Sequence, residues 1–321
     1  MAIRDTRRRP VPADNLRLGI GLAATTALIS GVAVFLNANG VKQVPDPAVY
    51  TTLKNGVAAI VLITLLAATP SSRRMIPALS RRQWLALASI GVIGGSVPFL
   101  LFFGGLAQAS APSAAFIHKT LFVWVALLAL PLLGERLGWP QLAAMALLLG
   151  SQVLLVNPAD VRWGSGETMI AAATLLWSME VILARRLLPA IPSLVGGAAR
   201  LGLGLVVLVA YLAISGRLAA IGAVSASGWV WILVTGLLLA GYVATWYAAL
   251  KRAPATIVTS VLVAAAPVTA GLTAIGSGAL PAPATALGHG LVLVGAGALA
   301  WAGLRAPRAA SRAASRAYGT G

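Results

Sequence analysis

Long apolar runs alternate with short polar connections along almost the whole chain. Each run is about as long as the ~20 residues that an α-helix needs to cross a bilayer. Charged and turn-forming residues separate the runs, as in Pro45-Asp46-Pro47 and Gly134-Glu135-Arg136. The pattern predicts ten membrane-spanning helices, near residues 16–39, 47–69, 84–107, 112–133, 139–157, 166–187, 193–214, 228–250, 254–277 and 283–304.

The composition supports a membrane protein and excludes several other classes. Hydrophobic residues make up 59% of the 321 residues and charged residues 10%, whereas soluble domains contain about 25% charged residues. A soluble fold of this size cannot bury so much apolar surface. The sequence has no cysteine and neither a P-loop nor an H-E-x-x-H motif. We therefore expect neither an enzyme nor a bound cofactor or metal.

The net charge of +17 comes from cations in alternate connections rather than from a nucleic-acid-binding patch. With ten spans, 18 Lys and Arg residues fall on the side of both termini and three on the opposite side. Cytoplasmic connections are enriched in these residues, so both termini are predicted to lie in the cytoplasm, with the chain in the inner (cytoplasmic) membrane. The first run lacks a small-x-small cleavage pattern and is interpreted as a retained helix, not a signal peptide. The basic arm at 1–15 and the basic tail at 305–321, which is expected to be disordered, can touch anionic lipid headgroups.

The two halves of the chain resemble each other. Phe99–Leu106 aligns with Val243–Leu250, and Lys54, early in the second span, aligns with Arg200, early in the seventh. Because five spans is an odd number, the second copy starts from the opposite side of the membrane. The halves 16–157 and 166–304 are therefore predicted to form an inverted repeat, which is common in secondary transporters with a site at the repeat interface.

The stretch Ser110–Thr120 (SAPSAAFIHKT), the segment Leu132–Leu137 (LLGERL), Gln141 and Gly150 resemble one half of an EamA-type transporter of the drug/metabolite transporter superfamily. The resemblance covers nearly the whole chain in two tandem units. It implies transport of a small metabolite, often outward, without ATP hydrolysis. The second half has Gly278–Pro281 where the family often keeps an acidic residue. We interpret Glu135-Arg136, within this motif, as a structural helix-end pair that faces water.

Four charged residues lie inside the predicted spans, where each costs roughly 2.5–3.5 kcal/mol at mid-span. The helical rise places Lys54 and Lys119 toward the outer face. They either meet the substrate or snorkel to the headgroups. Glu180 and Arg200 lie toward the inner face. They form either a static bridge or a switch in which a proton or substrate bound by Glu180 releases Arg200.

Neutral polar and aromatic side chains complete the candidate site. Asn37 and His118, like Asn39 and Gln108, map to the outer half and favour a polar vestibule there. His118 and Lys119 are adjacent, so they point about 100° apart and are not expected to face the same cavity. A lone histidine is more often a hydrogen-bonded packing residue than a proton carrier. The aromatic residues of the third and eighth spans either line a cavity or pack against helices and lipid: Phe99, Phe102, Phe103, Tyr242, Trp246 and Tyr247.

These patterns favour an all-α secondary transporter that works by alternating access and exports a small metabolite. Three cations and one acid within the spans favour an anionic or zwitterionic substrate. A non-transporting scaffold or sensor, and a channel, are the alternatives, and a homodimer is a candidate assembly. The substrate-binding candidates are Lys54, Lys119, Glu180, Arg200, Asn37, His118, Tyr242 and Trp246.

Overall fold

A computed structural model describes residues 13–156 and 162–318, and this part of the chain contains helices but no strand. The arm at 1–12 and the connection at 157–161 lie outside the described residues. Nine helical segments of the described chain are long and apolar enough to cross a membrane, and the shorter helix Trp139–Leu155 is also apolar. Its 17 residues match the lower limit of about 17 for a spanning helix. Every predicted span corresponds to a helix, which confirms the all-α membrane fold.

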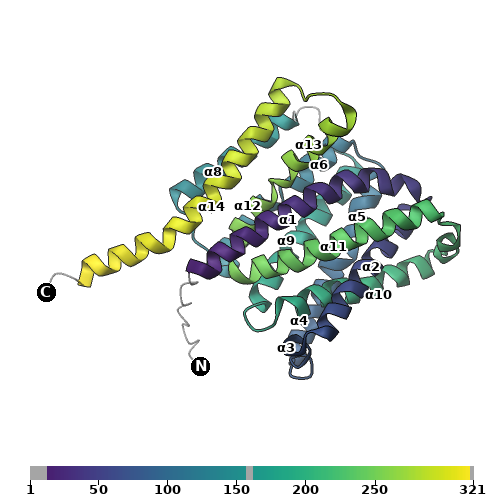
Figure 1. Cartoon of the computed structure of the whole chain (residues 1–321), viewed down its shortest axis with the longest axis horizontal. Helices are drawn as coiled ribbons and strands as arrows, with labels where there is room; N and C mark the ends of the chain where they lie inside the picture. Colours follow the sequence, from purple (N-terminus) through teal and green to yellow (C-terminus); the bar gives the residue numbers. More distant parts are fainter. Residues whose placement is uncertain (1–12, 157–161, 319–321) are drawn as a thin grey trace.

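In the described part of the chain, each half contributes five helical segments, and Figure 1 shows them packed into one bundle. The first half contains α1 (Ala13–Gly40), α2 (Pro47–Ala68), α4 (Arg81–Gly95) with α5 (Val97–Leu106), α6 (Ala111–Lys119) with α7 (Leu121–Leu133), and α8 (Trp139–Leu155). The second half contains α9 (Ser165–Leu187), α10 (Ser193–Ile214), α11 (Ala226–Arg252), α12 (Ala255–Leu262) with α13 (Ala265–Ser277), and α14 (Pro283–Tyr318). The short helices η1 (Val41–Gln43), α3 (Pro70–Arg73) and η3 (Leu218–Ala223) lie in connections.

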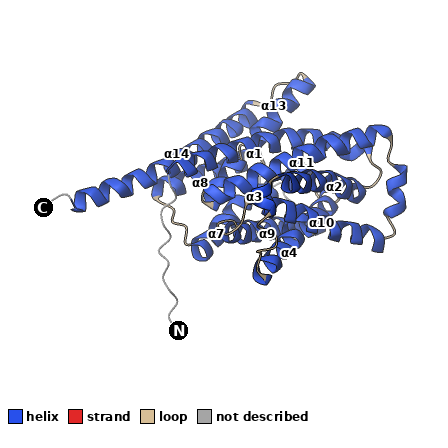
Figure 2. Cartoon of the chain, turned by 60° about the horizontal axis from the view of Figure 1, so that its bottom comes forward, coloured by secondary structure: helices blue, strands red, loops and turns tan. Residues whose placement is uncertain are grey.

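The packing of the helices reflects the inverted repeat. Helix α1 packs against α11, and its equivalent α9 packs against α4 and α5. Helix α2 packs against α11 in the same way that α10 packs against α4. The equivalent helices α2 and α10 also pack on each other, as do α8 and α14, which run together along one side of the bundle (Figures 1 and 2). A two-fold axis between two inverted halves produces this reciprocity.

Local sequence signals set the helix ends. The Asp46 carboxylate caps α2 by accepting hydrogen bonds from the amides of Ala48 (2.7 Å) and Val49 (3.3 Å), and Pro47 occupies the first turn. Helix α7 ends at Gly134, whose φ of 64° is the left-handed conformation that glycine adopts without a steric cost. These two signals explain why the predicted boundaries of these spans agree with the structure.

Three spans that the sequence predicts as continuous helices are interrupted. The third breaks at Ser96 between α4 and α5, the fourth at Thr120 between α6 and α7, and the ninth after Leu262 between α12 and α13. Proline explains the first break, because Pro98 has no amide hydrogen to continue the hydrogen bonds of α4. Interrupted helices line the substrate sites of many transporters. The three breaks therefore indicate where a binding site is expected, at the centre of the bundle.

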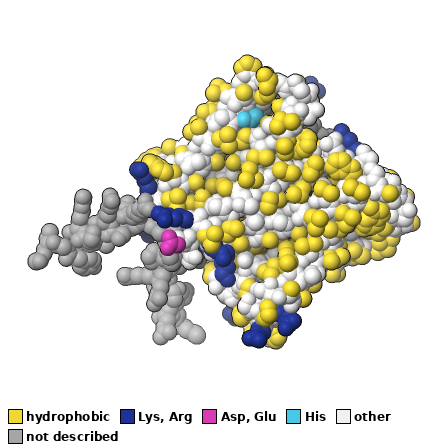
Figure 3. Space-filling model, in the orientation of Figure 1, with side chains coloured by type: hydrophobic (Ala, Val, Ile, Leu, Met, Phe, Trp, Pro, Cys, Tyr) yellow, Lys and Arg dark blue, Asp and Glu magenta, His cyan; other side chains and the backbone are white. Residues whose placement is uncertain are grey.

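The outer surface and the C-terminal tail complete the fold. Large apolar side chains such as Ile60, Val206 and Leu237 are exposed. Figure 3 shows hydrophobic side chains spread over one face of the bundle, with Lys and Arg mainly at its margins. Such a surface suits lipid. The expectation that the tail from Arg305 is disordered is wrong as far as Tyr318, where α14 ends (Figure 1), and residues 319–321 lie outside the described residues. Alanine and arginine dominate this segment and are strong helix formers.

Candidate functional site

A cavity of about 220 Å³ lies where the two halves meet. Helices α1, α2, α5, α6, α7, α9, α10, α11 and α12 contribute its walls, so both halves and parts of all three interrupted spans take part. Seven of the eight candidate substrate-binding residues line this cavity: Asn37, Lys54, His118, Glu180, Arg200, Tyr242 and Trp246. The residues that were assigned to separate outer and inner groups therefore share one space.

Lys119 is the candidate that lies elsewhere. The side chain is half-buried and is not part of the cavity wall. Because His118 faces the cavity and successive helical residues point about 100° apart, Lys119 faces another direction. Two expected members of the polar vestibule, Asn39 and Gln108, are exposed and also lie outside the wall. The predicted pair of lysines is thus a single lysine in the cavity.

Lys54 is a buried cation with neutral neighbours. It is 4% exposed, and its Nζ donates a hydrogen bond to Asn37 Oδ1 at 3.2 Å. The ammonium also lies 5.3 Å from the ring centre of Tyr50 and 5.1 Å from that of Phe103, distances typical of cation–π contacts. The Tyr50 hydroxyl holds the same Asn37 oxygen at 2.8 Å and thereby fixes its position. No carboxylate within the described residues forms an ion pair with Lys54.

Arg200 has the opposite kind of partner, a carboxylate. Its Nε lies 4.0 Å from Oε1 of Glu180, and the two side chains are 6% and 1% exposed. The Tyr247 hydroxyl donates a hydrogen bond to the same carboxylate oxygen. The predicted proximity of Glu180 and Arg200 is present, but the ion pair is long. Nε and Nη1 of Arg200 are buried and make no hydrogen bond to any described residue.

The break between α4 and α5 supplies a further acceptor for Arg200. In a continuous helix, the carbonyl of Gly94 would bond to the amide of residue 98, but Pro98 has no amide hydrogen. The free carbonyl accepts hydrogen bonds from Arg200 Nη2 (3.2 Å) and Trp177 Nε1 (3.1 Å). A Cβ at position 94 would also clash with Glu180 Cγ, so any larger residue there would displace the Glu180 side chain. The broken helix therefore positions the buried guanidinium.

Aromatic rings form two walls of the cavity. On one side, the ring of His118 lies 5.1 Å from both Phe102 and Trp177. On the other side, Tyr242 and Trp246 stack at 5.9 Å. The Nδ1 atom of His118 is buried and has no hydrogen-bond partner in the described chain, so the expectation of a hydrogen-bonded packing histidine is met for packing only.

The sequence reasoning missed Trp177 as a wall residue. It lies one helical turn before Glu180, on the same face of α9, and this spacing was the signal that could have found it. Thr235 and Ser30 also line the cavity, but nothing in their sequence context distinguishes them from other small polar residues in helices. Among the described residues, no three His, Asp or Glu side chains come together as a metal site would require.

The end of the bundle where α1 begins, called the basic end below, also carries the connections 69–80, 134–138, 188–192 and 253–254. Charged side chains tie its helices together there. Arg185 donates to the carbonyls of Leu250 (2.8 Å) and Lys251 (3.1 Å), and Lys251 donates to the carbonyl of Ile191 (2.6 Å). Positive groups at the carboxyl ends of helices are favoured by the helix dipole. These bonds join α9 and α11 and the connection that follows α9.

Glu135 joins the same end. The interpretation of Glu135-Arg136 as a helix-end pair facing water holds for Arg136, which is exposed, but is wrong for Glu135, which is half-buried and bonded to the second half. The carboxylate accepts hydrogen bonds from the Ala255 amide (2.7 Å), the Thr256 amide (3.1 Å) and the Thr256 hydroxyl (2.7 Å). It therefore caps the first turn of α12, where unpaired amides and the helix dipole favour an anion. The end of α7 in the first half is thus bonded to α12 in the second half.

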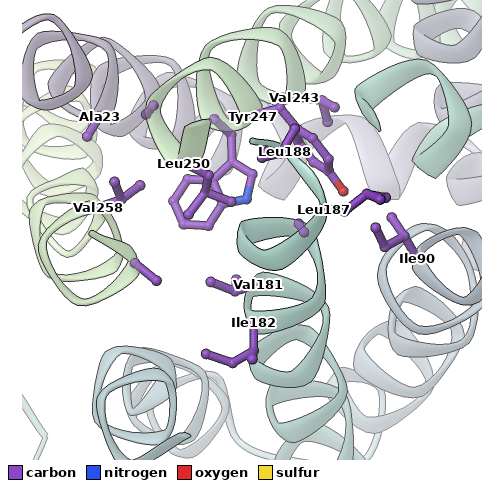
Figure 4. Packing of buried hydrophobic residues seen from close by; sticks show 14 of the residues in the cluster. Ala23, Ile90, Val181, Ile182, Leu187, Leu188, Val243, Tyr247, Leu250 and Val258 are labelled. Carbon is purple, nitrogen blue, oxygen red and sulfur yellow. The ribbon is translucent and has the colours of Figure 1, made fainter. Parts of the chain in front are cut away.

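Apolar packing fills the space between the cavity and the basic end. Val181 lines the cavity, and Figure 4 shows it in one apolar cluster with Tyr247, Leu250 and Val258, from α9, α11 and α12. Tyr247, Leu250 and Val258 are fully buried. The cavity is consequently closed toward the basic end by packed side chains as well as by hydrogen bonds.

The comparisons with known proteins agree with this architecture. A solved crystal structure of a protein superposes with a TM-score of 0.72 at 21% sequence identity, covering 88% of this chain and 97% of that one. This likeness shows the fold. No curated protein matches the sequence. The profile of the EamA-like transporter family matches residues 17–157 and 164–301. These two matches take in most of both halves, and the chain belongs to the EamA-like transporter family.

Proposed function

We propose that the protein is a secondary active transporter that moves a small metabolite with an anionic group across the cytoplasmic membrane by alternating access, without ATP hydrolysis. The observation that carries the proposal is the charge of the central cavity. Its wall contains two cations, Lys54 and Arg200, and one acid, Glu180. Both cationic residues are buried, and Glu180 can neutralise only one of them.

The uncompensated charge belongs to Lys54. A buried ammonium without an anionic partner is unfavourable unless water or a ligand offsets the loss of hydration. Its hydrogen bond to Asn37 and its two aromatic neighbours supply partial compensation. A substrate carboxylate or phosphate group would supply the full charge, and a lysine suits either as a point charge.

The rest of the cavity supports a small substrate with a ring or an apolar body. Its volume of about 220 Å³ limits the size of the substrate, and the rings of Phe102, Trp177 and Trp246 offer stacking surfaces. Because Glu180 shares the cavity with Lys54, its carboxyl group can also meet a polar group at the other end of the substrate.

The closed basic end supports alternating access. One side of the cavity is closed by the hydrogen bonds of Arg185, Lys251 and Glu135 and by the apolar side chains that pack next to them. If the termini are cytoplasmic, as the distribution of cations favours, this is the side that must open to exchange substrate with the cytoplasm. Export is the direction that the resemblance to the family implies.

Counterflow in proteoliposomes tests the proposal. The purified protein is reconstituted and loaded with one solute from a panel of similar size that contains organic acids, amino acids, neutral compounds and amines. Uptake of the same labelled solute should be saturable and accelerated by internal solute for a compound with an anionic group. A response restricted to neutral or cationic compounds would contradict the anion site. Flux without acceleration would indicate a channel, and no flux for any class would favour a scaffold or sensor.

A further inference from the structure

Glu180 has the surroundings of a group that can exchange a proton. Of the described residues that line the cavity, it alone is acidic. Its Oε1 accepts the hydrogen bond from Tyr247 and lies 4.0 Å from Arg200 Nε. Its Oε2 accepts no hydrogen bond from the described chain. Only one long ion pair and one neutral hydrogen-bond donor therefore stabilise the negative charge. This is weak stabilisation for a carboxylate that is 1% exposed.

The hydrogen bonding of the Arg200 guanidinium is also incomplete. Nη2 is bound to the Gly94 carbonyl, but the other two nitrogens are buried and unsatisfied. A guanidinium has five donor hydrogens, and burying them without acceptors is costly. Arg200 thus keeps unbonded donors, which an anion in the cavity can reach once the side chain turns away from Glu180.

Binding of an anion together with a proton would satisfy both side chains: the anion would accept hydrogen bonds from Arg200, and the proton would neutralise Glu180. An anion at Arg200 beside an ionised Glu180 would place two negative groups on one guanidinium, in a space with little water to screen them. A proton on Glu180 removes this repulsion. Building on the anion transport proposed above, we infer that Glu180 carries a proton that moves with the substrate: the carboxylate takes one proton from solution, releases Arg200, and Arg200 binds the anion.

The charges balance in this scheme. One proton and one monoanion bind in the same event, so the net charge of the site is the same before and after binding. The product of the proton step is a neutral carboxylic acid that can still accept the Tyr247 hydrogen bond. The activity that follows is symport of a proton with the anion.

The two cations of the cavity occupy equivalent positions in the repeat, but their different neighbours give them different roles. Lys54 on α2 and Arg200 on α10 occupy equivalent positions in the two halves, and both face the cavity. Lys54 has no acid beside it, so it is a permanent contact for the anion. Arg200 has Glu180, so it becomes available only when the proton binds.

Other ionisable groups surround Glu180 and must be separated from it experimentally. They are Arg200 on α10, Tyr242 and Tyr247 on α11, Lys54 on α2 and His118 on α6. His118 is the one whose usual titration range lies near neutral pH. It faces Trp177 and Phe102 rather than any donor or acceptor, and it provides the natural control.

The test measures proton uptake on binding of benzenesulfonate, an aromatic anion that keeps its charge at every pH used. The full-length protein in detergent is titrated with this probe in weakly buffered solution, and protons are counted with an indicator dye. We expect the wild type to take up about one proton per probe bound, with an affinity that falls up to about tenfold per pH unit once Glu180 is ionised. Glu180→Gln should bind with an affinity that does not depend on pH and take up no proton, and Glu180→Asp should restore the uptake.

Each alternative result has a defined meaning. His118→Asn alters the cavity wall and is expected to change the affinity for the probe, but it should still take up about one proton per probe bound; loss of the uptake there with retention in Glu180→Gln would overturn the assignment. Binding to the wild type without proton uptake would overturn the coupling and leave the anion site standing. No binding to the wild type would contradict the anion site and, with it, the coupling. A thermal unfolding curve for each variant identifies any that does not fold, in which case Glu180→Asp decides.

Discussion

The carboxylate of Glu135 offers a direct way to perturb the closure of the basic end. It follows α7 in the first half and accepts three hydrogen bonds from Ala255 and Thr256 at the start of α12 in the second half. Replacement by alanine removes all three bonds and the anion at the helix N-terminus. Losing an N-terminal cap costs about 0.5–2 kcal/mol, and hydrogen bonds to a charged group are each worth about 1.5–3 kcal/mol. Because water can replace some of these bonds, we take about 2 kcal/mol, which corresponds to about a 30-fold shift in an equilibrium.

A single cysteine in α12 reports this shift. Val258 on α12 is fully buried, and the chain has no native cysteine, so a Val258→Cys background can react only when α12 opens. Glu135→Ala should raise the rate of its reaction with a water-soluble maleimide by about 30-fold if opening precedes labelling. Glu167→Ala is the matched control, because Glu167 caps its own helix α9 through the Gly164 amide. An unchanged rate in Glu135→Ala, or an equal increase in Glu167→Ala, would refute the role of Glu135 in holding the two halves together.

Three further predictions address topology, the buried pair and the broken helix. In sealed right-side-out vesicles, a cysteine in place of Lys42 should react with an impermeant maleimide. A cysteine in place of Arg82 should react only after permeabilisation, and labelling there from outside would show that the orientation is the opposite of the predicted one. Removing Glu180 or Arg200 alone should lower stability by about 3 kcal/mol, more than removing both, and additive losses in thermal unfolding would show that they do not interact. Pro98→Ala restores an amide that competes for the carbonyl acceptor of the guanidinium, so benzenesulfonate affinity should fall about fivefold, for a hydrogen bond worth about 1 kcal/mol; an unchanged affinity would contradict the role of the break.

The sequence predicts much of the fold because membrane insertion imposes a simple pattern. Apolar length and the positions of Lys and Arg locate every span, and the alignment of Lys54 with Arg200 identifies equivalent positions that both prove to face the cavity. The helix breaks are harder to predict. Pro98 gives a local reason for one of them, but the break at Thr120 has no proline near it and depends on how α6 and α7 pack against other helices.

The partners of the charged residues follow from three-dimensional contacts that a single sequence does not contain. Depth along a helix, estimated from residue spacing, separates Lys54 from Glu180, whereas the helices tilt and cross so that both line one cavity. Glu135 lies in the most distinctive family motif, but its bonds go to residues 120 and 121 positions further along the chain. Spacing within a helix can suggest a neighbour such as Trp177, but it cannot reveal a contact between the two halves.

The most direct test of the central claim compares two lysines in counterflow. Lys54 lines the cavity, and Lys119 lies at a comparable depth within its span but outside the cavity wall. For an anionic solute that the wild type exchanges, Lys54→Gln should lower the apparent affinity or rate at least tenfold, while Lys119→Gln transports like the wild type at equal expression. If Lys54→Gln also exchanges the anion with unchanged affinity and rate, the cavity does not recognise its substrate through this charge.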